Sequence, residues 1–213
     1  MIMLTANRPL PRQNKNEPLQ SNMYKPLIIL ALTISSCSSP NYKDPHVIIH
    51  SDFGKIEVEL YPQKAPHSVA AFVSYINKGL YKNSSFYRVL KAEDLPTDNN
   101  SGLIQGGIYL SNTSNIQVTG IPHESTQSSG LSHTDGIVSL ARTEPGTATT
   151  EFFICIGDQS SLDHGRKGTP DGLGMAAFGK IYKGMNIVKR IQSQKSKGDI
   201  FEKRISISNI KPL

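Results

Sequence analysis

The chain has 213 residues, of which 37% are hydrophobic, and this is enough for one ordinary buried core in one folded domain. Its formal net charge is +6, but half of that excess lies in the first 36 residues. Lysine and arginine form no dense stripe interleaved with aromatic residues, so composition and charge argue against a nucleic-acid-binding protein.

Residues 1–36 are typical of a sorting signal rather than of a folded segment. An apolar run too short to span a bilayer stably follows Lys25, and a pair of serines leads to Cys37. Small residues directly before a cysteine resemble the bacterial lipoprotein signal. We therefore expect removal of residues 1–36 and an acylated Cys37. The protein would then be exported and held on a membrane, facing the periplasm or the cell exterior. The alternative is an ordinary secretory signal that contains a cysteine, and initiation at Met23 would give a signal of normal length.

The folded domain is expected to cover residues 46–213, after a short polar tether over residues 37–45. Two apolar segments, 47–50 and 55–60, flank the sequence Asp-Phe-Gly at residues 52–54. The second segment alternates apolar and charged residues, which is typical of a half-buried strand. The pair therefore predicts an opening β-hairpin.

Two amphipathic helices and six further strands follow along the chain. The first helix begins at Pro66, which suits a first helical turn, and ends at Gly79. The second covers residues 185–194, with its apolar side chains on one face. The strands are expected over residues 86–90, 104–109, 136–141, 152–156, 176–182 and 205–210. Two helices set apart among eight strands favour a capped barrel over a parallel βαβ arrangement. Residues 91–102 and 157–174 are polar, turn-rich segments that predict surface loops.

Four short motifs occur in a fixed order within this domain. They are Phe-Tyr-Arg-Val at 86–89, Ile-Gln-Gly-Gly at 104–107, Gly-Ile-Val-Ser-Leu-Ala-Arg at 136–142 and Phe-Phe-Ile-Cys at 152–155. Together they resemble the cyclophilin family of peptidyl-prolyl cis-trans isomerases, and further matches extend the resemblance from His46 to the C-terminus. The resemblance implies a mainly β fold, a closed eight-stranded antiparallel β-barrel capped by two α-helices. It also implies a monomer that accelerates rotation about X-Pro bonds in proline-containing polypeptides and so assists protein folding.

Arg88 is the predicted catalytic residue. Rotation about a peptide bond is opposed by about 18–20 kcal/mol, because the nitrogen lone pair is delocalised into the carbonyl group. A catalyst must favour the twisted state, in which the prolyl nitrogen regains its lone pair, and it needs no nucleophile, metal or cofactor. A guanidinium is always charged and can donate to that lone pair only in the twisted state. The alternative is a solvated arginine on a strand.

Gln105 is the second predicted catalytic residue, because its amide can donate to and accept from a substrate backbone at once. The family motif places Phe153 at the floor of a proline pocket, with Leu103 and Leu162 as walls. Phe152 should point to the other face, since side chains alternate along a strand. The alternatives are a structural glutamine and a plain core phenylalanine. The resemblance adds four residues to the substrate-binding set: Ala141, Arg142, Glu151 and Met175.

The chain departs from the family pattern at the predicted site. Gly102 stands where the family usually has a second pocket phenylalanine, and Glu151 stands where it usually has glutamine. Met175 aligns near the pocket histidine of some eukaryotic members. We expect the Glu151 carboxylate to compete for the Arg88 guanidinium, which would affect the turnover rate more than the type of reaction.

Other classes of protein fit the sequence less well. A disulfide is not expected, since Cys37 would carry lipid and Cys155 lies in an apolar strand. His46 and His50 would lie about 13 Å apart on a strand, too far to chelate one metal ion. The Gly-x-Ser-x-Gly motif of serine hydrolases is missing from the sequence. The alternative that stays open is a chaperone or scaffold that captures proline-containing segments with little catalysis, although binding alone does not need Arg88.

Overall fold

The computed structural model describes residues 42–91, 101–111, 116 and 118–213. The predicted signal, Cys37, most of the predicted tether and most of the predicted loop 91–102 lie outside the described residues. Within the described part of the chain, no helix is long and apolar enough to cross a membrane.

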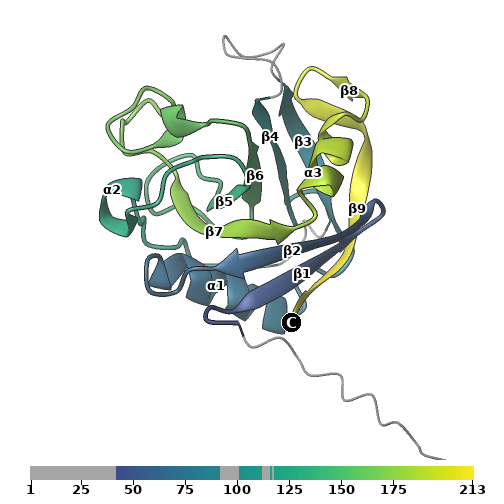
Figure 1. The fold of residues 1–213 in the computed structure, drawn as a ribbon, viewed down its shortest axis with the longest axis horizontal. Helices are drawn as coiled ribbons and strands as arrows, with labels where there is room; N and C mark the ends of the chain where they lie inside the picture. The colour runs from purple at the N-terminus through teal and green to yellow at the C-terminus, as the bar shows by residue number, and fades with distance from the viewer. Residues whose placement is uncertain (1–41, 92–100, 112–115, 117) are drawn as a thin grey trace, which may run out of the picture. The chain divides into compact units, whose positions relative to one another are not determined.

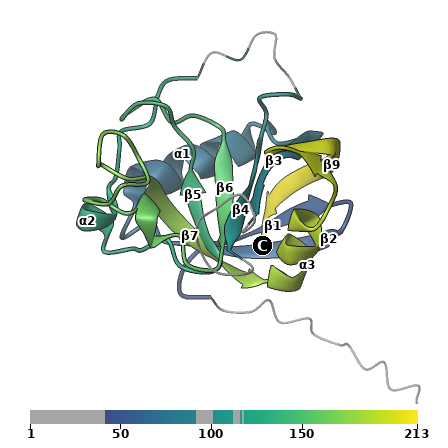
Figure 2. The same cartoon turned by 90° about the horizontal axis from the view of Figure 1, so that it is seen from above.

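The strands form one antiparallel sheet that closes on itself (Figures 1 and 2). Their hydrogen-bonded order is β1-β2-β7-β5-β6-β4-β3-β9, and a further pairing of β1 with β9 closes the barrel. The two-residue strand β8 pairs with β9 alone. In chain order the described strands are β1 (His46–Ser51), β2 (Gly54–Leu60), β3 (Ser84–Lys91), β4 (Gly102–Gly107), β5 (Ile137–Leu140), β6 (Phe152–Ile156), β7 (Ala176–Lys183), β8 (Ser196–Lys197) and β9 (Ile200–Pro212). The predicted eight-stranded closed barrel is confirmed.

Two longer helices lie on opposite sides of the barrel, α1 (Pro66–Asn77) and α3 (Met185–Gln192). The described residues also form the short helix α2 (Thr126–Ser129) and the 3-10 helix η2 (Ser160–Leu162). At the start of α1, proline occupies the first turn and the Glu124 carboxylate accepts hydrogen bonds from two backbone N–H groups and a serine hydroxyl. These bonds satisfy donors that a helix start leaves free and favour a negative charge there.

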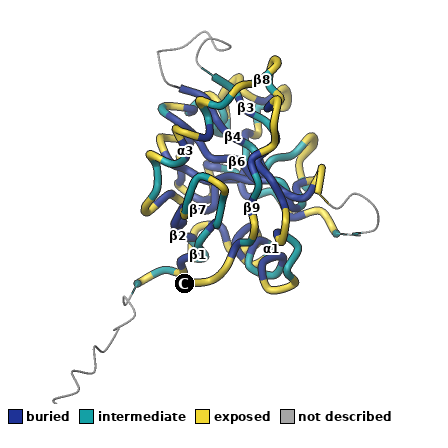
Figure 3. The backbone as a smooth tube through the Cα atoms, turned by 90° about the vertical axis from the view of Figure 1, so that its right-hand side faces the viewer, coloured by how far each residue is buried: buried dark blue, intermediate teal, exposed yellow. Residues whose placement is uncertain are grey.

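The alternation along β6 divides the apolar side chains between two buried clusters. Phe152 joins the larger cluster, where its ring packs edge-on against Phe72 of α1 at 5.6 Å between centroids. Phe153 points the other way into a smaller cluster together with Leu103 and Cys155. The predicted opposition of the two phenylalanines is therefore confirmed. Figure 3 shows that β4 is buried along most of its length and β6 throughout, and both strands carry part of the site.

Several element boundaries differ from the sequence prediction, and the end of β4 and the unpredicted β8–β9 hairpin have identifiable reasons. β4 ends at Gly107 rather than at Tyr109, because the backbone N–H groups of Ile108 and Tyr109 donate to the Glu151 carboxylate instead of to a neighbouring strand. The β8–β9 hairpin was not predicted, because residues 195–199 are polar and lack the apolar alternation that marks a strand. This hairpin adds a turn beside β3.

Candidate active site

One cavity of about 610 Å³ collects all nine residues that the sequence predicted for catalysis and substrate binding. It is walled by β3, β4, β6 and the connections that follow β5 and β6. The predicted residues in its lining are Arg88, Leu103, Gln105, Ala141, Arg142, Glu151, Phe153, Leu162 and Met175. The lining also includes residues that the sequence analysis missed: Leu90, Thr143, Thr147, Thr149 and Gly168.

Arg88 projects from β3 with its guanidinium held from two sides. Its Nε donates to Oδ2 of Asp199 at 2.7 Å, and its Nη1 donates to Oε1 of Gln105 at 3.0 Å. The side chain keeps 36% of its surface exposed. Its remaining N–H groups donate to no other residue in the described part of the chain, so they are available to a molecule in the cavity.

Gln105 lies beside Arg88 on β4, and its amide is oriented by bonds at both ends. Oε1 accepts from Arg88, and Nε2 donates to the hydroxyl of Tyr87 at 2.8 Å. Burial, together with the nearby Glu151 carboxylate, raises the pKa of Tyr87, so this hydroxyl keeps its proton. Each end of an amide retains a second hydrogen-bonding position, and Gln105 can still meet a peptide backbone.

Glu151 does not pair with Arg88, so the expectation that it competes for the guanidinium is wrong. Its Oε1 accepts from the backbone N–H groups of Ile108 at 2.8 Å and Tyr109 at 3.0 Å, and from the hydroxyl of Thr150 at 3.1 Å. Burial raises the pKa of Glu151, while these hydrogen bonds act in the opposite direction. The carboxylate that pairs with Arg88 belongs to Asp199, 111 residues further along the chain.

The floor of the cavity is apolar. Phe153 is 3% exposed and packs in the cluster with Leu103, while Leu162, Met175 and Ala141 lie against the same cluster partly exposed. A ring of proline size can therefore pack against apolar side chains at this floor. This arrangement suits an apolar ring carried by a polypeptide.

No side chain replaces the second pocket phenylalanine at Gly102. This residue has φ +142°, and a Cβ built on it would collide with the Leu90 carbonyl oxygen. Nε2 of Gln192 occupies the adjacent space and donates to the carbonyl oxygens of Leu90 at 3.1 Å and Ser101 at 3.3 Å. The Leu90 side chain itself lines the cavity.

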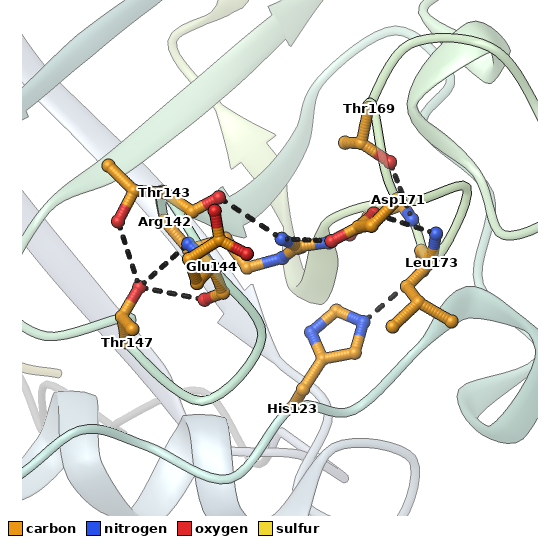
Figure 4. A network of polar contacts seen from close by, with 9 residues as sticks. His123, Arg142, Thr143, Glu144, Thr147, Thr169, Asp171 and Leu173 are labelled. Atoms are coloured by element: carbon orange, nitrogen blue, oxygen red, sulfur yellow. Dashed lines mark hydrogen bonds and ion pairs between the residues drawn. The ribbon is translucent and has the colours of Figure 1, made fainter.

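Arg142 also lines the cavity, and Figure 4 shows the polar network in which its side chain lies. Its Nη1 and Nη2 donate to the two carboxylate oxygens of Asp171 at 2.7 and 3.1 Å, and Nη2 and Nε also donate to the Gly174 carbonyl at 2.6 and 3.2 Å. The guanidinium holds the pKa of Asp171 well below its usual range. Since the side chain is only 2% exposed, Arg142 fastens the loop before β7 and shapes the wall of the cavity.

A buried hydrogen-bonded chain lies behind the floor. Nδ1 of His133 lies 2.6 Å from Oδ1 of Asp163, Nε2 lies 3.0 Å from Oγ of Ser139, and the imidazole stacks on the Phe153 ring at 5.9 Å. Burial lowers the pKa of His133 although Asp163 opposes the shift, so the neutral ring donates to Asp163 and accepts from Ser139. His133 and Ser139 are both fully buried, so this chain supports Phe153 and cannot act as a hydrolase triad.

The fold and the cavity together define a class of protein: a closed β-barrel with an apolar floor that can seat a ring beside the Arg88 guanidinium, as rotation about an X-Pro bond requires. The sequence could not indicate Tyr87, His133 or Asp199 as parts of this site, because each acts through a partner that only the folded chain brings near. The one available signal was the position of Tyr87 next to Arg88 in a motif.

Known proteins place the chain within a family. The family model for cyclophilin type peptidyl-prolyl cis-trans isomerase/CLD matches residues 46–212. The chain is 35% identical over 164 residues to peptidyl-prolyl cis-trans isomerase A of Dickeya dadantii, which covers 76% of this chain and 79% of that protein. It is 31% identical over 147 residues to peptidyl-prolyl cis-trans isomerase B of Escherichia coli, with coverage of 68% and 83%.

The fold is also similar to that of a solved protein described as a cyclophilin type isomerase. The crystal structure of a cyclophilin type peptidyl-prolyl cis-trans isomerase from Cryptosporidium parvum aligns with a TM-score of 0.63 at 20% sequence identity, covering 79% of this chain and 97% of that chain. The chain therefore belongs to the cyclophilin-type peptidyl-prolyl cis-trans isomerases. Its activity is the cis-trans isomerisation of peptide bonds that precede proline.

Proposed function

We propose that Arg88 is the catalytic group of this isomerase and that Gln105 holds the substrate backbone beside it. The observation that carries the proposal is that the Arg88 guanidinium lines the same cavity as Phe153. Some of the N–H groups of this guanidinium donate to none of the described residues. The prolyl ring packs on Phe153, and the guanidinium donates to the prolyl nitrogen as that atom becomes pyramidal. This bond exists only in the twisted state, so it lowers the barrier rather than strengthening ground-state binding.

The substrate class in this proposal is a polypeptide segment that contains proline. A second Cryptosporidium parvum structure, described as in the presence of the dipeptide Ala-Pro, aligns with a TM-score of 0.62 at 21% identity and covers 78% of this chain. The cavity here has an apolar floor for a ring and polar threonines at one side, which suits a ring within a peptide backbone.

The alternative function, a scaffold that binds proline segments with little catalysis, draws on Gly102 in place of a second pocket phenylalanine. A protease-coupled assay on a prolyl tetrapeptide separates the two functions when it is paired with a binding isotherm for the same peptide. We expect acceleration of the cis-to-trans step at concentrations where the peptide binds. Saturable binding without acceleration would favour the scaffold.

We further propose that the protein is exported and carries lipid on Cys37. The support is in the sequence: a basic residue, a short apolar run and two serines directly before the cysteine. Expressed from its full sequence, the parent should label with a fatty-acid probe and fractionate with membranes. Cys37→Ser should lose the label and appear in the soluble fraction, while Cys155→Ser, which alters a buried thiol of the domain, should keep the label. Continued labelling of Cys37→Ser would refute the assignment.

A further inference from the structure

Asp199 lies in a tight turn that contacts β3, the strand that carries Arg88. The turn joins β8 to β9, with Lys197 paired to Ile200, and Gly198 adopts φ +57°, a conformation that favours glycine. The backbone carbonyl of Asp199 accepts a hydrogen bond from the Val89 N–H at 2.8 Å. Asp199 is therefore fixed to β3 through its backbone at the residue directly after Arg88.

An irregularity in β3 aims Arg88 at this turn. The register of β3 shifts between Phe86 and Arg88 against both of its neighbours, β4 and β9. Such bulges redirect a side chain and are common beside active sites. As a result Arg88 pairs with Ile200 at the start of β9, and the Asp199 carboxylate reaches its Nε at 2.7 Å.

The two bonds on Arg88 fix the plane of the guanidinium. Asp199 holds Nε on one side and Gln105 holds Nη1 on the other, and a guanidinium is rigid and planar. The remaining N–H groups of Arg88 therefore face the cavity in one fixed orientation of the side chain. Arg88 also holds the pKa of Asp199 below its usual value, so the carboxylate is charged at neutral pH.

The charge of Asp199 has a smaller effect than its position. A carboxylate beside a guanidinium lowers the positive potential that the prolyl nitrogen would meet. The side chains of Arg88 and Asp199 are 36% and 45% exposed, so water and salt screen that potential. The orientation of the guanidinium is not screened in this way, and preorganised donors are a large source of catalysis.

We propose that Asp199 is a positioning residue for catalysis, acting through Arg88, an inference that rests on the proposed role of Arg88. This positioning role requires that removal of the Asp199 carboxylate lowers the isomerisation rate only while Arg88 is present. It also requires that an uncharged acceptor at the same place preserves most of the effect.

The test is a double-mutant cycle with full kinetics. In the parent background Asp199→Ala should lower kcat/KM about two- to five-fold, chiefly through kcat, the size expected for a half-exposed ion pair. Asp199→Asn keeps an oxygen acceptor and should retain about half of the parent value or more. In the Arg88→Ala background Asp199→Ala should have no further effect. Glu202→Ala, which removes an exposed carboxylate three residues further along, is the matched control.

A spectroscopic readout separates failure of this inference from failure of the Arg88 assignment. The ¹⁵Nε–¹H resonance of Arg88 should exchange slowly with water in the parent and in Gln105→Ala, and rapidly in Asp199→Ala. Equal rate losses in both backgrounds would overturn the positioning role and make Asp199 merely structural. An unchanged resonance in Asp199→Ala would also overturn it. If Arg88→Ala kept full activity while the resonance behaved as expected, the role of Arg88 would fail and the ion pair would stand.

Discussion

Replacing Arg88 with alanine removes the proposed donor to the prolyl nitrogen while leaving the apolar floor intact. A charge-assisted hydrogen bond contributes roughly 1.5–3 kcal/mol net. At about 1.36 kcal/mol per decade of rate, its loss should lower kcat/KM about ten- to a hundred-fold. Because the bond forms only in the twisted state, kcat should account for the loss and KM should change little.

The same substitution should barely affect folding. Arg88 is 36% exposed and its ion pair with Asp199 is open to solvent, so the pair contributes less than about 1 kcal/mol to stability. For a domain of this size the midpoint of thermal unfolding should then shift by no more than about 4 °C. Arg88→Lys should not restore the rate, because a single ammonium cannot bond Asp199 and Gln105 and still present a fixed donor.

The assay is protease-coupled isomerisation of a prolyl tetrapeptide, run beside thermal unfolding of the same preparations. A kcat/KM for Arg88→Ala equal to that of the parent would refute the assignment. A large loss of thermal stability in the mutant would instead show that Arg88 is chiefly structural, and the drop in rate would then say nothing about a bond to the prolyl nitrogen.

Two further predictions concern buried ionisable groups. Glu151→Gln should keep kcat/KM within about ten-fold of the parent, about 1.4 kcal/mol in barrier height, since the amide oxygen can accept the same backbone hydrogen bonds. Burial raises the pKa of Glu151 above its ordinary value of 4.5, so the stability of the parent falls as pH rises above 4.5. The Glu151→Gln variant carries no such group and should be the more stable form at pH 7. A hundred-fold gain in activity would mean that the native carboxylate suppresses catalysis. His133 has a pKa lowered from 6.5, so its contribution to stability is present above pH 6.5 and is lost as pH falls toward its folded value. In denaturant titrations His133→Gln should flatten the fall in unfolding free energy as pH drops below 6.5. An unchanged slope would contradict the view that the buried neutral His133 ring is a source of this pH dependence.

Local patterns in the sequence were enough for most of the elements. The boundaries of β6 are those predicted, and α1 begins at the predicted proline. These segments follow short-range rules, a period of two for a strand and a helix start at proline. Such rules depend on neighbouring residues in the sequence and not on tertiary contacts. The alternation at Phe152 and Phe153 likewise determined that the two rings face opposite ways, and the family motif indicated Phe153 as the ring at the cavity.

The resemblance of ordered motifs located the site but not its hydrogen bonds. It brought Arg88, Gln105 and Phe153 into one predicted pocket, and the structure places them at one cavity. It could not say which carboxylate meets Arg88. The sequence favoured Glu151, because a motif places that residue next to the pocket phenylalanines, whereas the folded chain turns Glu151 toward backbone N–H groups beyond β4.

The sequence by itself determined the barrel, its two longer helices and nine of the side chains around the cavity, since each follows from periodicity within a segment or from the family motifs. Tertiary structure alone decided that Asp199 meets Arg88, that Tyr87 orients Gln105 and that His133 supports the floor. Asp199 and Arg88 lie 111 residues apart, and their contact depends on a bulge in β3 and on the glycine turn between β8 and β9. No periodicity within a segment encodes such a meeting, because it is set by how strands far apart in the sequence pair once the barrel has closed.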